Sequence, residues 1–102
     1  MITTVDGLRY GQLVRSIAGR DQNNLYLILS LINDRFIEVA DGVKHRVANP
    51  KKKNLKHVRV KMLVAKDIEE IILRGESVLD SQVSTAIQRL KNELEEGDRL
   101  NG

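Results

Sequence analysis

The 102-residue sequence contains no cysteine and no tryptophan, and it has a single proline. Without cysteine the chain can form neither a disulfide nor a zinc site with thiolate ligands. Only Tyr10, Tyr26 and Phe36 are aromatic, so the core must be built mainly from Ile, Leu and Val. No apolar run approaches the ~20 residues of a membrane-spanning helix. The first residues also lack the basic and apolar regions of a signal peptide, so we expect a cytoplasmic protein that contacts no membrane.

The most informative absence is that of carboxylates between Asp41 and Asp67, where nine Lys or Arg residues occur. Residues 1–66 hold 13 basic and 5 acidic side chains, whereas residues 67–102 hold 4 basic and 9 acidic ones. Repulsion among so many like charges opposes folding unless a polyanion neutralises it. The basic part of the chain is therefore expected to bind a polyanion, while the acidic part faces away or binds another partner.

Strand-like patterns fill the region from about residue 9 to residue 62. Residues 25–32 form a continuous apolar run whose length and polar boundaries favour a buried strand. Asp41-Gly42 predicts a tight turn, because both residues tolerate positive φ. The expected strands are residues 12–17, 25–32, 35–40, 43–47 and 57–62. Five short strands joined by small turns predict a compact β-barrel over residues 1–62.

From about residue 64 the apolar period becomes helical. Val64, Ile68, Ile71 and Ile72 share one face of a first helix, and Gly75 is expected to end it. A second helix carries an apolar stripe of Val83, Ile87, Leu90 and Leu94. Its start is open between a Ser77–Asp80 capping box and Asp80 as the N-cap, and Gly97 is expected to end it. Residues 63–102 are thus predicted to be a helical extension packed on the barrel, in a mainly β protein with an α tail.

The segment from Gly11 to Asp21, Gly-Gln-Leu-Val-Arg-Ser-Ile-Ala-Gly-Arg-Asp, resembles a KOW motif, in which a glycine-containing loop joins two strands. Two further matches follow in the expected order, Val39-Ala40-Asp41-Gly42 and the basic segment from Asn49 to His57. Together they are similar to the small bacterial KOW-domain RNA-binding proteins, which are related to large-subunit ribosomal proteins of archaea and eukaryotes. The resemblance covers residues 9–60 well and the last helix more loosely.

This resemblance implies an SH3-like barrel and a non-enzymatic RNA-binding protein of the translation machinery. The expected partners are ribosomal RNA of the large subunit and ribosomal proteins, and the chain is expected to be a monomer. We expect Lys51, Lys52 and Lys53 to project as mobile ammonium groups suited to phosphate contacts, although a solvated loop is the plainer interpretation. The predicted RNA-binding residues are Gly19, Arg20, Asp21, Arg46, Asn49, Lys51, Lys52, Lys53, Asn54, Lys56 and His57.

No catalytic, metal or cofactor site is expected. His45 and His57 lie twelve positions apart without a second pair of ligands nearby, which does not suit a metal. Ser16 is not part of a recognised nucleophile motif, and the chain has no P-loop or dinucleotide-binding glycine pattern. Tyr26 and Phe36 are expected in the core, whereas Tyr10 could either pack or stack on an unpaired base.

A different function remains open for the acidic part of the chain. Small barrels of this kind also serve in protein complexes, and a fold does not fix a function. The alternative hypothesis is therefore a protein–protein interaction or regulatory module that uses the acidic amphipathic helices as its binding surface. The salt dependence of RNA binding, compared with capture of a protein partner by the helices, would separate the two hypotheses.

Overall fold

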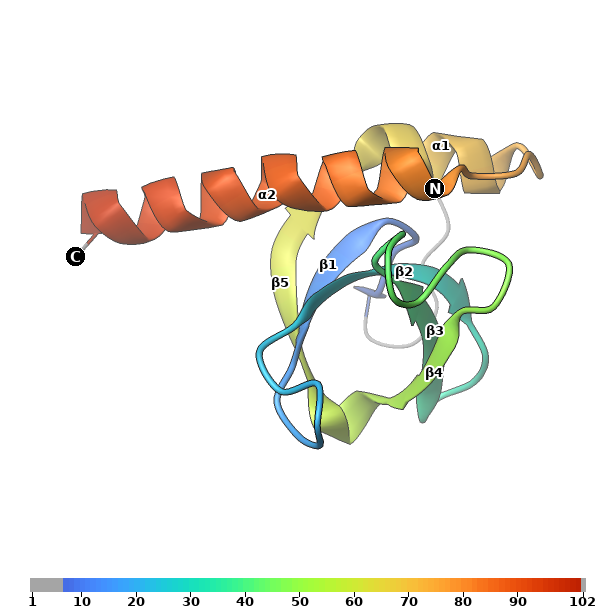
Figure 1. Cartoon of the computed structure of the whole chain (residues 1–102), viewed down its shortest axis with the longest axis horizontal. Helices are drawn as coiled ribbons and strands as arrows, with labels where there is room; N and C mark the ends of the chain where they lie inside the picture. Colours follow the sequence, from blue (N-terminus) through green and yellow to red (C-terminus); the bar gives the residue numbers. More distant parts are fainter. Residues whose placement is uncertain (1–6, 102) are drawn as a thin grey trace.

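The computed structural model describes residues 7–101, with side chains described as far as residue 97. Residues 1–6 and 102, which belong to the predicted barrel and helical extension, lie outside the described residues. A five-stranded antiparallel sheet is followed by two helices, as the patterns predicted (Figure 1). The strands are β1 (Gln12–Ser16), β2 (Leu25–Leu31), β3 (Phe36–Ala40), β4 (Lys51–Asn54) and β5 (Val58–Val64).

The sheet is strongly curved, and its strand order is β4-β3-β2-β1-β5 (Figure 1). β1 to β4 follow one another as a meander, and the chain then returns so that β5 pairs with β1. The sheet edges β4 and β5 are joined by the short 3₁₀ helix η2 (Leu55–His57). The curvature leaves a concave inner face, and both helices lie against the opposite, outer face (Figure 1).

Both faces of the sheet are covered, which accounts for the continuous apolar run in β2. Successive residues of a strand point to opposite faces. Val14 and Ile28 therefore lie in the inner core, whereas Leu13 and Leu27 lie in the outer core beneath the helices. The inner core contains Leu8, Val14, Tyr26, Ile28, Ile37, Val39 and Val58. The outer core contains Leu13, Leu27, Ala65, Ile68, Val78, Val83, Ala86 and Leu90.

The first helix, α1 (Lys66–Leu73), begins two residues later than predicted, because Val64 still pairs with Gln12 in the sheet. Gly75 ends it as expected. The φ of Gly75 is 76°, and its N–H bonds to the carbonyl of Ile72, while the N–H of Glu76 bonds to that of Ile71. These two hydrogen bonds form a Schellman motif, in which a left-handed residue closes the last turn of a helix.

The second helix, α2 (Asp80–Asn101), buries the predicted apolar stripe against the sheet but differs from the prediction at both ends. Asp80 is its first residue, and the Gln82 side chain accepts a hydrogen bond from the N–H of Leu79, as in half of a capping box. Gly97 does not end the helix. It does not adopt the left-handed conformation seen at Gly75, so glycine there weakens the helix without closing it.

The predicted fourth strand, residues 43–47, is wrong. Asp41 Oδ1 accepts hydrogen bonds from the N–H groups of Val43, Lys44 and His45, at 2.9, 3.0 and 2.9 Å. A carboxylate that takes three successive backbone donors coils the chain and removes donors that a strand would need. The fourth strand is instead β4, formed by the basic segment that the sequence predicted to be exposed.

Gly11 and Gly42 allow the sheet to approach the starts of the two helices closely. A Cβ on Gly11 would lie 2.7 Å from the carbonyl oxygen of Ala65, just before α1. A Cβ on Gly42 would overlap the carbonyl oxygen of Asp80, the first residue of α2. Both glycines also have positive φ, 77° and 80°. Only glycine combines that backbone conformation with such close approach, so these positions fix how the helices sit on the sheet.

Candidate nucleic-acid interface

Three segments of the chain meet around one pocket of about 460 Å³. The segments are the β1–β2 loop, the loop between β3 and β4, and the basic strand with its following turn. We call this site the basic pocket. It is lined by Ala18, Gly19, Arg20, Asp21, Lys44, His45, Lys51, Lys53 and His57. Four of these side chains are Lys or Arg and two are His, against a single carboxylate.

Strand alternation decides which lysines of β4 reach the basic pocket. β4 pairs with β3 so that Lys51 lies opposite Val39, Lys52 opposite Glu38 and Lys53 opposite Ile37. Val39 and Ile37 belong to the inner core, so Lys51 and Lys53 point to the inner face. Lys52 points outward, where its ammonium lies 4.5 Å from the centre of the Phe36 ring. The three adjacent lysines therefore do not form one cluster.

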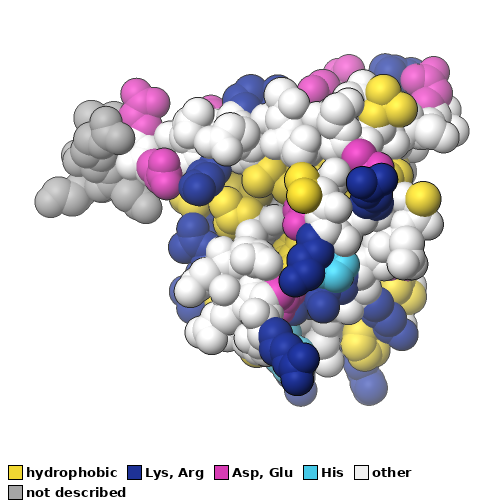
Figure 2. Space-filling model, in the orientation of Figure 1, with side chains coloured by type: hydrophobic (Ala, Val, Ile, Leu, Met, Phe, Trp, Pro, Cys, Tyr) yellow, Lys and Arg dark blue, Asp and Glu magenta, His cyan; other side chains and the backbone are white. Residues whose placement is uncertain are grey.

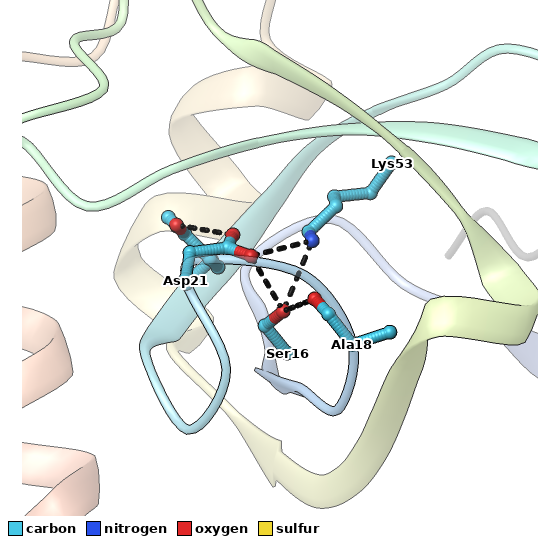
Figure 3. Close-up of polar contacts among 5 residues, drawn as sticks. Ser16, Ala18, Asp21 and Lys53 are labelled. Carbon is cyan, nitrogen blue, oxygen red and sulfur yellow. Dashed lines mark hydrogen bonds and ion pairs between the residues drawn. The ribbon is translucent and has the colours of Figure 1, made fainter.

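Lys53 is buried, which corrects the expectation that all three ammonium groups are mobile. Its side chain is 8% exposed, and its Nζ donates to Asp21 Oδ1 and to Ser16 Oγ, both at 3.0 Å (Figure 3). Tyr26 donates its hydroxyl to the other oxygen of Asp21 at 2.8 Å. A buried charge is tolerated only when it is paired and hydrogen-bonded, as here. This cluster fixes the β1–β2 loop against β4.

The cluster also shifts two pKa values. Burial disfavours the ionised form of Asp21, but hydrogen bonds from Tyr26, Lys53 and Ser16 and the charge of Lys53 outweigh burial. The pKa of the Asp21 carboxyl therefore lies well below its ordinary value. Burial, followed by the hydrogen bond to Asp21 and the negative charge of that carboxylate, raises the pKa of Tyr26 to about 12. Asp21 thus stays ionised and its charge is matched by Lys53.

Ser16 and Lys53 lie within hydrogen-bonding distance, but their arrangement does not suit nucleophilic catalysis. Ser16 is 0% exposed, so a substrate carbonyl cannot reach its hydroxyl. Its oxygen accepts from Lys53, and its single hydrogen can serve only one of two acceptors, Asp21 Oδ1 at 3.0 Å or the Ala18 carbonyl at 3.1 Å. The Ser16 hydroxyl is fully engaged in hydrogen bonds within the protein, as Figure 3 shows.

With Asp21 paired internally, Arg20, Lys44 and Lys51 supply the positive charge available to a ligand. None of the three makes an ion pair with another described residue within 4 Å. Arg20 and Lys44 are exposed and Lys51 is half-buried. His45 is half-buried beside the Tyr26 ring, with 5.8 Å between ring centres. In Figure 2, most Lys and Arg side chains lie over the strands and loops, while most Asp and Glu side chains lie along the helices.

The structure brings some of the predicted RNA-binding residues together and separates others. Gly19, Arg20, Asp21, Lys51, Lys53 and His57 line the basic pocket. Those outside it are Arg46, Asn49, Lys52, Asn54 and Lys56. Arg46, Asn49 and Lys56 are exposed. The Asn54 side chain accepts a hydrogen bond from the N–H of Lys56 at 2.9 Å and so caps η2.

Sequence reasoning missed Lys44 and His45 as residues of the pocket. Both lie in the carboxylate-free stretch, so their charge was visible, but assigning residues 43–47 to a strand obscured their position. The three backbone hydrogen bonds to Asp41 turn this loop toward the β1–β2 loop. The Asp41-Gly42 pair could have indicated this loop, because an Asp at such a pair can form an Asx turn as well as a hairpin.

Comparison with models of known protein families and with curated protein sequences found no match to this chain. Among the side chains that the structure describes, those of residues 7–97, no group of three or more His, Asp or Glu could hold a metal ion. In the same part of the chain, no helix is long and apolar enough to cross a membrane.

Proposed function

We propose that this protein is a non-enzymatic RNA-binding protein of the translation machinery, and that its basic pocket holds the sugar-phosphate backbone of folded ribosomal RNA. The observation that carries the proposal is the convergence of Arg20, Lys44 and Lys51 on one concave site. Such a concentration of positive charge without matching carboxylates has a polyanion as its natural partner. The pattern that resembles a KOW motif contributes Gly19, Arg20 and Asp21 to the same site.

Three features of the pocket suit RNA. Arginine and lysine neutralise phosphates, and the arginine guanidinium can make two parallel hydrogen bonds to one phosphate. His45 and His57 line the pocket as well, and imidazole rings can stack on unpaired bases or donate to phosphate. The internal Asp21–Lys53 pair keeps the loop in place before RNA arrives, so less conformational entropy is lost on binding.

The proposal includes an SH3-like barrel of the KOW kind as the finer description of the curved sheet. Three observations support it: the meander from β1 to β4, the return of β5 beside β1, and a single core on the concave face. In such a barrel the loops at one end are free to contact RNA while the strands hold them rigidly.

The rival function is a protein–protein interaction module that uses the acidic helices. α2 extends beyond the sheet toward its C-terminal end (Figure 1). Glu93, Glu95 and Glu96 are exposed on this part of the helix. An overhanging acidic helix could dock on a basic protein surface, including that of a ribosomal protein.

A binding titration against large-subunit ribosomal RNA fragments, repeated at several salt concentrations, tests the proposal. The pocket variant changes Arg20, Lys44 and Lys51 together to Gln. The matched control changes Arg35, Lys66 and Arg74 to Gln, which removes the same charge at positions outside the basic pocket. Loss of three phosphate contacts should reduce the slope of log K against log[salt] by about 2–3, at ~0.7–0.9 per contact.

Equal loss of affinity in the pocket variant and in the control would mean that net charge, not the pocket, governs binding. If RNA does not bind at all and a variant with Glu93, Glu95 and Glu96 changed to Gln loses a protein partner, the rival function takes precedence. Sedimentation of the parent protein with large subunits, and its release at high salt, would tie the RNA to the ribosome.

A further inference from the structure

A second cluster of cations lies on the outer face of the sheet and is not part of the basic pocket. Arg15 of β1 and Arg59 of β5 are direct partners in the register of these strands. Their neighbours Val14 and Val58 belong to the inner core, so both arginines lie on the outer face. Like charges directly opposite each other in a sheet are destabilising. Neither arginine makes an ion pair within 4 Å to another described residue.

Arg15 also has an unmet hydrogen-bonding requirement. Its Nε is a buried donor without a hydrogen-bond acceptor among the described residues. Buried side-chain donors in folded proteins are nearly always satisfied, and an exception calls for an explanation. Arg15 lines a pocket of about 360 Å³ between the β1–β2 loop and α2. An acceptor from outside the chain could enter there and reach the guanidinium.

The surroundings of Arg15 suit a phosphodiester backbone. We call this site the side groove, and define it by Arg15, Asn23, Asn24, Leu25, Asp41, Ile87, Gln88 and Lys91, together with Arg59 at its edge. The amides of Asn23, Asn24 and Gln88 can hydrogen-bond sugar hydroxyls and phosphate oxygens. Asp41 is the single carboxylate lining the groove, and its Oδ1 is occupied by three backbone N–H donors.

One loop separates the side groove from the basic pocket. Gly19, Arg20 and Asp21 of the β1–β2 loop line the basic pocket, and Asn23 and Asn24 of the same loop line the side groove. The loop is held firmly at its base, where the N–H of Asn23 bonds to the Ser16 carbonyl at 2.7 Å. The φ of Asn23 is 77°, a left-handed conformation that turns the chain from one site toward the other.

From these observations we propose that the side groove is a second phosphate-binding surface, over which an RNA backbone held in the basic pocket continues after crossing the β1–β2 loop. The inference rests on the proposed function and adds the direction in which the bound RNA backbone runs. The RNA passes across the loop from the pocket toward α2, and Arg15, Arg59 and Lys91 neutralise its next phosphates. The cross-strand arginines Arg15 and Arg59, which lack an ion-pair partner among the described residues, both acquire one in that complex.

The test compares RNAs of two lengths and uses a charge-matched control. Arg59 and Lys91 are exposed, so changing both to Gln removes two cations without opening the core. The control changes Arg35 and Lys66 to Gln. On a long, folded ribosomal RNA fragment, the groove variant should lose about 1.5 from the slope of log K against log[salt], at ~0.7–0.9 per contact. On an oligonucleotide of only three or four nucleotides, chosen as too short to cover both sites, the groove variant should bind like the parent.

Two results would overturn the inference while leaving the proposed function intact. One is a groove variant whose affinity and slope match those of the control on the long RNA, while the pocket variant loses binding. The other is a groove variant that loses affinity for a polyglutamate peptide but keeps that for RNA, which would assign the surface to an acidic protein. Absence of RNA binding in the parent protein would instead remove the proposed function itself. Arg15→Gln is a second groove variant for the same titrations on long and short RNA. Its melting temperature shows whether the variant still folds.

Discussion

The burial of Lys53 leads to the sharpest stability prediction. Changing Lys53 to Met keeps most of the side-chain volume but removes the ammonium group from Asp21. Breaking a buried ion pair by removing one partner destabilises proteins by about 3–5 kcal/mol, because the remaining charge has no partner. The Asp21 side chain is 11% exposed and keeps its hydrogen bonds from Tyr26 and Ser16, so part of that penalty is avoided. We therefore expect a loss of roughly 2–4 kcal/mol in the free energy of unfolding.

Urea unfolding followed by circular dichroism measures this loss, and Lys52→Met is the matched control on the adjacent residue. Lys52 points outward over the Phe36 ring, and exposed cation–π contacts contribute only ~0.5–1 kcal/mol. The reasoning would be refuted if the two variants unfold within about 0.5 kcal/mol of each other. In that case Lys53 would not be the buried partner of Asp21 in solution, and the cluster that fixes the β1–β2 loop would be absent.

The same pair makes a pH prediction with a definite sign. The pKa of Asp21 is lowered in the folded protein, so its contribution to stability is present above the unfolded pKa of about 3.9 and is lost as pH falls toward the folded pKa. In Lys53→Met one hydrogen bond and the positive charge are gone while burial remains, so the pKa of Asp21 rises. The stability difference between parent and variant should therefore shrink as the pH falls below about 4.

Three further predictions concern packing and alkaline stability. Gly42→Ala should destabilise the protein by about 2–4 kcal/mol, because its Cβ would overlap backbone at the start of α2. Gly75→Ala, which has a similar φ but open space around it, should lose only ~1 kcal/mol, and thermal melts of both variants measure the difference. Leu90→Ala should lose about 2–5 kcal/mol from the outer core, and Leu79→Ala, 60% exposed, close to nothing, in the same assay. The raised pKa of Tyr26, about 12, contributes stability that is fully present below the unfolded pKa of ~10. Stability should therefore fall more between about pH 10 and 12 in the parent than in Tyr26→Phe, as measured by urea unfolding.

Much of the fold could be predicted from local patterns. The apolar run in β2 and the alternation in β1, β3 and β5 each follow from one segment of sequence, as does the apolar stripe of α2. The end of α1 at Gly75 was also a local matter, since glycine there provides the left-handed residue of a Schellman motif. Gly97 is also a glycine but lacks the left-handed conformation, and the residue type alone could not distinguish the two positions.

The site was harder to predict because it depends on partners that are distant in sequence. Lys51, Lys52 and Lys53 look equivalent in a row, and only the register of β4 against β3 reveals that the middle one faces outward. The burial of Lys53 depends on Asp21, which lies 32 positions away. Lys44 lies at the pocket because Asp41 forms an Asx turn, whereas the sequence had predicted a hairpin there. Residue types were therefore visible in the sequence, and their grouping was not.

The central claim, that the basic pocket is where RNA binds, is tested most directly by NMR. Backbone amide shifts of the parent protein would be followed during titration with a large-subunit ribosomal RNA fragment. The account predicts the largest changes at residues 19–21, 44–45 and 51–53, with the exposed end of α2 at residues 93–96 unaffected. Changes concentrated on α2, with the residues of the basic pocket unmoved, would contradict it.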